Sequence, residues 1–227
     1  MKVLILVTNQ NKYLKHNIPT GLWLSELTHM YEGCIKNNIQ VIIASPKGGE
    51  TPIDPESLKA FVLDSLTKKY CNDITFLELL KNTIPLAQVS EKDFDAIYLT
   101  GGHGTMYDFV GNETLNNLIK LFYENNKIVS AVCHGVCGLI GVKLSNGEYL
   151  IDGKNITGYS WFEEILARRK KQVPFNLEQV LKEKKANYKK GFVPLASFVI
   201  TDRNLITGQN PFSSKKLAET VIEKLTK

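Results

Sequence analysis

Cys133 is the residue best suited to covalent chemistry. It follows the apolar run 128–132 (IVSAV), which has the character of a buried strand, and it precedes a segment expected to become helical near Gly135. A sharp strand-to-helix turn holds the side chain out of the sheet, and the first N–H groups of the helix carry partial positive charge. Because that charge favours a thiolate, the sequence predicts a nucleophile at Cys133, whereas Cys137 is expected to be an inert buried thiol.

The histidines limit what this thiol can do. The chain has four, His16, His29, His103 and His134, and only the immediate neighbour of the cysteine lies after it. A papain-like protease or an ordinary glutamine amidotransferase needs a distant downstream histidine, so both arrangements are excluded as they stand. No G-x-S-x-G is present, which argues against a serine hydrolase. The partner of Cys133 is therefore expected to be either His134 or His103.

Glu26 is the most informative carboxylate. In an expected helix over 21–37 it lies three residues after Trp23 and four before Met30, on or beside an apolar stripe. Burial beside such residues favours the protonated carboxyl, which can hydrogen-bond a thiolate and move protons near neutral pH. An acid at the edge of the stripe that reaches water is an equally good interpretation.

The glycine-rich turn 101–104 (GGHG) follows the strand-like run 96–99 (AIYL). Glycines in such a turn let backbone N–H groups approach a bound oxygen closely, as an oxyanion hole requires. The turn lacks the spacing of a dinucleotide-binding motif, and G-x-x-x-x-G-K-[ST] occurs nowhere in the chain. Binding of nucleotide phosphates is therefore unsupported.

The remaining acids and thiols give weaker signals. Glu163 and Glu164 start an expected helix, where capping and dipole compensation explain them, although one of them could orient a histidine. Cys133, His134 and Cys137 would make an incomplete metal cluster that lacks a fourth ligand, so no metal is predicted.

These groups can converge only if the elements that carry them form a parallel sheet. Apolar runs of strand length alternate with amphipathic stretches, which is typical of parallel strands covered on both faces. The carboxyl ends of such strands lie at one edge of the sheet, so 8–9, 100–104 and 133–135 should meet there. The expected strands are 3–7, 41–44, 96–99 and 128–132, and the expected helices are 21–37, 113–125 and 213–225.

Composition and charge fit an ordinary globular protein. Of the 227 residues, 43% are hydrophobic and 22% are charged, and no apolar run is long enough to span a membrane. The net charge of +5 resides in the stretch 168–190, whose nine basic and two acidic residues leave −2 for the rest. A solvated helix face explains this stretch better than nucleic-acid binding. Four cysteines and no export signal predict reduced thiols in the cytoplasm.

Five segments together resemble the ThiJ/PfpI superfamily, most closely its heat-shock-inducible, glyoxalase III-like branch. The resemblance implies a flavodoxin-like three-layer α/β sandwich with a mostly parallel central sheet, in a single domain over 1–227 that forms homodimers. Within that domain, 46–92 would be a cap-like excursion and 147–211 would be C-terminal β/α additions. The segments are ASPKGGETPIDPES (44–57), GGHGTMYDF (101–109), AVCHG (131–135), ITGYSWFEE (156–164) and LITGQNP (205–211).

The resemblance also implies roles for the candidate residues. Cys133 corresponds to the nucleophile of the family, and His134 to the histidine of its triad. The acid that completes the triad corresponds best to Glu164, with Glu163 as the weaker match. Glu26 corresponds to the buried glutamate that the family carries on its first helix.

Oxyanion stabilisation would come from the glycine-rich turn. The resemblance assigns it to Gly102, His103 and Gly104, together with the N–H of His134. One departure is the pair 136–137 (VC), where relatives often have Pro-Ala; this alters the pocket wall without touching the triad.

The activity implied by the resemblance is a cofactor-free, glutathione-independent glyoxalase reaction. Cys133 would attack methylglyoxal or glyoxal to give a hemithioacetal, and methylglyoxal would leave as lactate. Alternatives are a protein deglycase, a redox-sensitive holdase chaperone and, less well supported, a cysteine peptidase or amidase. Neither nucleic acid nor a membrane is an expected partner.

Overall fold

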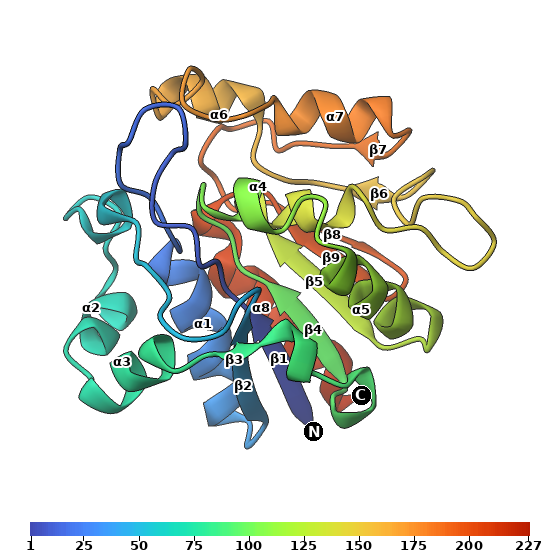
Figure 1. The fold of residues 1–227 in the computed structure, drawn as a ribbon, viewed down its shortest axis with the longest axis horizontal. Coiled ribbons are helices and arrows are strands. Elements are labelled where there is room, and N and C mark those ends of the chain that lie inside the picture. The colour runs from blue at the N-terminus through green and yellow to red at the C-terminus, as the bar shows by residue number, and fades with distance from the viewer.

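A central sheet of seven strands separates two layers of helices in the computed structural model, which describes all 227 residues (Figure 1). The strand order is β3-β2-β1-β4-β5-β9-β8, and every neighbouring pair is parallel except β8 with β9. The predicted three-layer α/β sandwich with a mostly parallel sheet is confirmed. The strands are β1 (Lys2–Leu6), β2 (Gln40–Ser45), β3 (Ile84–Pro85), β4 (Ala96–Leu99), β5 (Ile128–Val132), β8 (Val199–Asp202) and β9 (Leu205–Gly208).

Helices cover both faces of this sheet. On one face α1 packs beside α8, and on the opposite face α5 packs on β4 and β5 (Figure 1). The sequence of α5 shows why: Asn112 accepts a hydrogen bond from Leu115 N at its start, and apolar residues then recur at helical spacing on the buried side. The longer helices are α1 (Leu24–Lys36), α5 (Glu113–Glu124) and α8 (Ser214–Thr226). The shorter ones are α2 (Ser65–Cys71), α3 (Ile74–Lys81), α4 (Thr105–Asp108), α6 (Trp161–Leu166) and α7 (Leu177–Glu183).

Two predicted boundaries near the site are wrong. Helix α1 begins later than expected, at Leu24, because Leu22 is extended: its N–H donates to Pro52 O at 2.8 Å and its carbonyl accepts from Asp54 N at 2.9 Å. The segment after β5 was expected to become helical near Gly135, and it is a 3-10 helix that already begins at Cys133 (Cys133–Leu139). The late start of α1 comes from backbone contacts with a segment distant in the sequence, which periodicity does not report.

The segment 46–92 runs along α1 and includes the edge strand β3, after which come two 3-10 helices, Leu86–Gln88 and Glu91–Asp93. It contains a 3-10 helix, Pro55–Leu58, followed by α2 and α3, and α2 meets α1 where the hydroxyls of Thr28 and Thr67 lie 2.9 Å apart. Its middle, around Phe61, reaches the carboxyl edge of the sheet, where it lines a pocket.

The segment 147–211 lies beyond the same edge of the sheet. It carries α6, α7 and a small parallel pair, β6 (Asn155–Ile156) with β7 (Asn187–Tyr188), before β8 and β9 join the main sheet. The N-terminal loop 10–20 contacts the segment 147–211 near α6, where His16 Nε2 lies 3.0 Å from Lys171 O (Figure 1).

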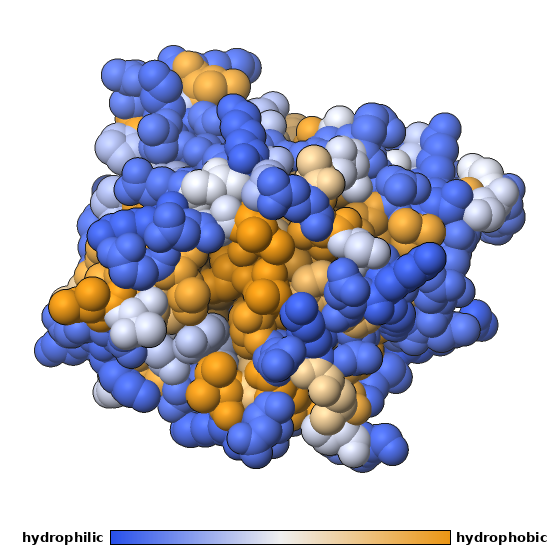
Figure 2. Space-filling model, turned by 60° about the horizontal axis from the view of Figure 1, so that its bottom comes forward, coloured by the Kyte–Doolittle hydropathy of each residue, from blue (hydrophilic) through white to orange (hydrophobic).

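The surface is mixed in character. Figure 2 shows one face on which hydrophobic residues gather around a hollow, with hydrophilic residues surrounding them. None of the helices combines the length and the apolar character that crossing a bilayer requires.

Candidate active site

Cys133 stands at the turn where β5 ends. Its φ is +55°, in the left-handed region that non-glycine residues rarely adopt, and only 2% of its surface is exposed. The turn is tight because β4 lies beside it: a Cβ on Gly135 would lie 2.3 Å from Thr100 O. The backbone thus holds the Cys133 side chain in one orientation, at the edge of the sheet where the strand ends meet.

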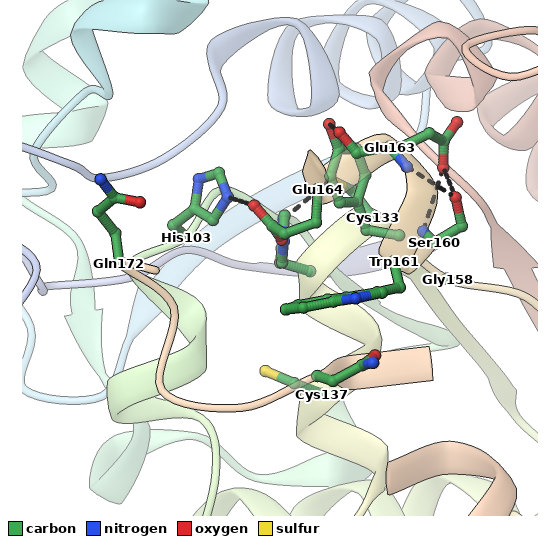
Figure 3. A network of polar contacts seen from close by, with 12 residues as sticks. His103, Cys133, Cys137, Gly158, Ser160, Trp161, Glu163, Glu164 and Gln172 are labelled. Carbon is green, nitrogen blue, oxygen red and sulfur yellow. Dashed lines mark hydrogen bonds and ion pairs between the residues drawn. The ribbon is translucent and has the colours of Figure 1, made fainter. Parts of the chain in front are cut away.

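His134 and Glu164 follow Cys133 in a continuous line of polar contacts. Cys133 Sγ lies 3.3 Å from His134 Nδ1, and His134 Nε2 lies 2.7 Å from Glu164 Oε2 (Figure 3). All three residues are buried, and Glu164 comes from the first turn of α6. An anionic carboxylate at Nε2 requires the proton on that nitrogen, which leaves Nδ1 free to accept the thiol proton.

Glu163 has a different set of partners, although it adjoins Glu164. It forms a capping box with Ser160 at the start of α6, and its Oε1 accepts from Asn210 Nδ2 at 2.7 Å and from Leu195 N at 3.0 Å. Of the two adjacent acids, only Glu164 contacts a histidine.

His103 reaches the other oxygen of Glu164. Its Nε2 lies 2.9 Å from Glu164 Oε1, and its ring centroid lies 4.1 Å from that of His134 (Figure 3). The sequence left His103 and His134 as alternative partners of Cys133. The structure places His134 at the thiol, and the side chain of His103 contacts Glu164 instead, which sequence reasoning did not anticipate. The available signal was that His103 stands on a neighbouring strand end, so its imidazole had to lie near His134.

The electrostatics of this cluster favour a neutral histidine beside an ionised acid. Burial, together with the charge of His103, lowers the pKa of His134 to about 4. Burial alone would raise the pKa of Glu164, but the two histidines more than offset it and hold that pKa below its usual range. Near neutral pH, His134 is therefore a proton acceptor held by an anion.

Glu26 approaches Cys133 from α1. It is fully buried, and its Oε2 accepts a hydrogen bond from Gly101 N at 2.6 Å. Burial raises the pKa of Glu26 to about 8, although hydrogen bonds from Cys133 and Gly101 oppose the shift. Its Oε1 is buried without a hydrogen-bond partner, which disfavours a charge there and favours the protonated carboxyl. Of the two sequence interpretations, the buried one describes this side chain.

The expected preference for a thiolate is outweighed in the structure. Burial, and after it the charge of Glu26, raises the pKa of the Cys133 thiol well above its usual value, while the His134 N–H lowers it. Burial and the charge of Glu26 raise the pKa of Cys133 together only when Glu26 is ionised. Cys133 and Glu26 are therefore best described as a pair that shares one proton.

The glycine-rich turn presents free donors beside the thiol. The N–H groups of Gly102, His103 and Gly104 donate no hydrogen bond within the protein. Gly102 has a φ of +97°, and a Cβ there would lie 2.1 Å from Gly21 O, so only glycine fits. This turn can offer N–H groups to an oxygen bound near Cys133.

A pocket of about 260 Å³ opens above Cys133. Its rim is bridged by an ion pair in which Arg169 Nη2 lies 3.2 Å from Glu56 Oε1. Sequence reasoning missed the lining, which comes from segments far apart in the chain. Its aromatic and aliphatic members include Trp23, Phe61, Tyr159, Leu166, Leu195 and Phe212.

The histidine–glutamate cluster is also a possible set of metal ligands. Atoms of His103, His134 and Glu164 that could bind an ion lie within 4.8 Å of one another. Here they hydrogen-bond to one another, so a metal would replace both contacts and occupy the histidine that faces Cys133. The cluster rejected from the sequence is not assembled, because Cys137 Sγ donates to Thr105 O at 3.3 Å.

Known proteins match this chain along nearly its full length. The model of the DJ-1/PfpI family matches residues 1–224. Glyoxalase 3 of Candida albicans is 30% identical over 98% of this chain and 97% of its own, and its crystal structure superposes with a TM-score of 0.89. The glutathione-independent glyoxalase HSP31 of Saccharomyces cerevisiae is 29% identical over 99% of this chain and 98% of its own. Rapid Encystment Protein 24 KDa of Francisella tularensis is 39% identical, with a TM-score of 0.94 over 99% of this chain and 98% of its own.

Proposed function

The chain belongs to the DJ-1/PfpI family, and from this membership we propose that it is a glutathione-independent glyoxalase that converts methylglyoxal to lactate. The observation that carries the proposal is the position of Cys133, with Glu26 on one side and His134, backed by Glu164, on the other. An isomerisation that moves a proton between adjacent carbons needs a nucleophile flanked by proton carriers, and no cofactor.

The reaction begins when the Cys133 sulfur attacks the aldehyde carbon of methylglyoxal. The proton shared with Glu26 ends on the new oxygen, which the N–H groups of the glycine-rich turn stabilise while it is charged. The product is a hemithioacetal that is still a ketone at the second carbon, and Glu26 is now a carboxylate.

The Glu26 carboxylate then removes the proton from the first carbon, and the hemithioacetal hydroxyl passes its proton to the ketone oxygen, which gives an enediolate. Glu26 returns its proton to the second carbon, and the oxygen on the first carbon becomes the carbonyl of a lactate thioester. The first carbon is thereby oxidised and the second reduced, so the electrons balance within the substrate. Water, activated by His134, hydrolyses the thioester to lactate and regenerates the thiol.

Burial of the thiol favours a small aldehyde over a peptide. Cys133 is only 2% exposed at the floor of its pocket, so the carbonyl of an extended peptide chain could not reach it without opening the walls. A glycated side chain is longer and thinner, so deglycase activity is the second candidate. The exposed apolar rim, including Phe61 and Phe212, favours a holdase role as a third.

Residues 46–92 act as a cap in this proposal. Glu56 and Phe61 of this segment face the part of the pocket formed by Arg169 and its neighbours, so the two sides together limit access to Cys133. We expect the active protein to be a homodimer, which sedimentation equilibrium would measure.

Lactate formation from methylglyoxal without glutathione tests the proposal. Wild type should produce lactate, and Cys133→Ala and Glu26→Gln should each lose at least about a hundredfold in kcat/KM. Cys137→Ala is the matched control, because this buried thiol lies on the same 3-10 helix and its hydrogen bonds go to Thr105. An inactive wild type, or equal activity in Cys133→Ala, would overturn the assignment.

A further inference from the structure

The pocket above Cys133 is larger than methylglyoxal requires. It measures about 260 Å³. Methylglyoxal has five non-hydrogen atoms, which fill less than about 150 Å³ even at the roughly 30 Å³ that one molecule of liquid water takes. A three-carbon substrate bound at the thiol therefore leaves unfilled space between itself and the rim.

Most polar groups of the pocket fall into two sets. One set is Cys133, His134 and His103, and the other is Glu56, Arg168 and Arg169, of which Glu56 and Arg169 pair with each other. The walls between them are mainly apolar. A substrate that uses both regions has its reacting carbonyls at the floor and an apolar substituent against the walls.

Three wall residues expose apolar surface that an occupant would cover. Phe61 is 80% exposed, Leu166 is 49% exposed and Phe212 is 46% exposed, and they come from three separate segments that meet at the opening. Covering such surface removes it from water and contributes favourable free energy in proportion to the apolar area covered. A methyl group at the thiol is too short to gain this energy.

We propose that the preferred substrates of this site are 2-oxoaldehydes whose ketone carries an apolar group larger than methyl, such as a branched alkyl chain. This inference rests on the proposed glyoxalase function and adds the substrate class. The reaction is unchanged: the aldehyde carbon is oxidised to a carboxylate, the ketone is reduced to an alcohol, and water supplies the new oxygen. The substituent stays intact and supplies binding energy to the transition state.

The test compares methylglyoxal with 4-methyl-2-oxopentanal, in which isobutyl replaces methyl. This probe has eight non-hydrogen atoms, which fill less than about 240 Å³ by the same measure, and its ketone has similar reactivity. We expect its kcat/KM to exceed that of methylglyoxal by about tenfold, with 2-hydroxy-4-methylpentanoate as the product. A kcat/KM equal to or below that of methylglyoxal would overturn the inference.

Wall variants separate the contribution of the pocket from intrinsic reactivity. In Phe61→Ala and Phe212→Ala, the ratio of the two kcat/KM values should fall by about fivefold or more towards unity. Phe192→Ala is the matched control, because Phe192 is fully exposed and lies outside the pocket lining. A ratio that stays constant in both wall variants would overturn the inference while leaving the proposed function intact. Absence of turnover with both substrates would instead remove the proposed function itself.

Discussion

His103 Nε2 lies 2.9 Å from Glu164 Oε1, on the carboxylate whose other oxygen holds His134 at 2.7 Å. Glu164 is thus held between two imidazoles that come from neighbouring strand ends. Each oxygen has its own donor, so the carboxylate cannot rotate without breaking one contact. The orientation of His134 towards Cys133 therefore depends on His103, which touches neither the thiol nor its partner nitrogen.

Removing the N–H group that His103 offers to Glu164 should lower kcat. In His103→Phe, Glu164 Oε1 is left buried without a partner, at a cost of about 2 kcal/mol. The loosened carboxylate no longer fixes His134, so kcat for methylglyoxal should fall about tenfold or more while KM changes little. Steady-state kinetics measure both parameters.

The conservative variant distinguishes positioning from packing. His103→Gln retains an N–H that can reach the same oxygen, so it should recover most of the kcat lost in the phenylalanine variant. Equal losses in both variants, or a loss confined to KM, would contradict a positioning role for His103.

Two adjacent glutamates offer a sharper comparison. In Glu164→Gln, an NH2 group, which donates, replaces one of the two oxygens that accept. Each of the two histidines donates to one of these oxygens, so one histidine loses its acceptor. His134 then loses the partner that fixes its tautomer, and kcat should fall by about 10³-fold or more, since replacing the acid of a Ser-His-Asp triad by an amide costs about 10⁴-fold. Product formation at saturating substrate measures this loss.

Glu163→Gln is the control for this variant. The single carbonyl oxygen of glutamine can keep either the capping-box contact with Ser160 N or the contacts with Asn210 and Leu195, because these donors bind different oxygens of Glu163, so some stability should be lost. Neither set of contacts includes a histidine. We expect kcat to stay within about twofold of wild type. A larger loss in Glu163→Gln than in Glu164→Gln would reverse the assignment of the triad acid.

The pair of Glu26 and Cys133 predicts a rise of activity with pH. With the pKa of Glu26 raised to about 8, both groups are protonated below that pH and no thiolate forms. Above it the pair holds one proton, and the form with the proton on Glu26 carries the nucleophile. The value of kcat/KM should therefore rise about tenfold per unit below pH 8 and level off above it. In Glu26→Gln the rise of kcat/KM below pH 8 should disappear. A pH profile identical to that of wild type would contradict the coupled titration of Glu26 and Cys133.

The same shift predicts a gain in stability when the acid is removed. The pKa of Glu26 is higher in the folded protein than in the unfolded chain, so its contribution is most favourable below about pH 4.5 and is lost as the pH rises through 8. Glu26→Gln should therefore be more stable than wild type at pH 9, by on the order of 4 kcal/mol, and close to wild type at pH 4. Urea denaturation at the two pH values measures the difference. A variant less stable than wild type at pH 9 would contradict the direction of the shift.

The sequence supported the fold and the convergence of the strand ends because those depend on local patterns. Continuous apolar runs and alternating helices define a parallel sheet, and a parallel sheet brings 100–104 beside Cys133. The extended conformation of Leu22 was not predictable, since it depends on backbone contacts with Pro52 and Asp54, which lie far along the chain.

The side-chain contacts in the site likewise include some that local patterns predict and others that they do not. Helix periodicity places Glu26 near the apolar side of α1, but it cannot distinguish a buried carboxyl from one that reaches water. The contact of His103 with Glu164 and the pocket lining were missed because they depend on side-chain direction and on loops from several segments. The pKa of Cys133 depends on its desolvation, which no motif encodes.

Gly102 couples the oxyanion turn to the start of α1, and its substitution should be severe. In Gly102→Ala the new Cβ would lie 2.1 Å from Gly21 O and 2.7 Å from Trp23 N, on a residue whose φ is +97°. Either the turn or the chain before α1 must move, so both the melting temperature and kcat should fall. Gly111→Ala isolates the backbone term, because Gly111 has a φ of +73° with nothing within 4 Å of the added Cβ. We expect that control to lose only about 1 kcal/mol of stability and to keep its activity. Thermal melts and lactate assays on both variants measure these effects, and equal losses of stability would show that the close approach at Gly102 is not what requires glycine.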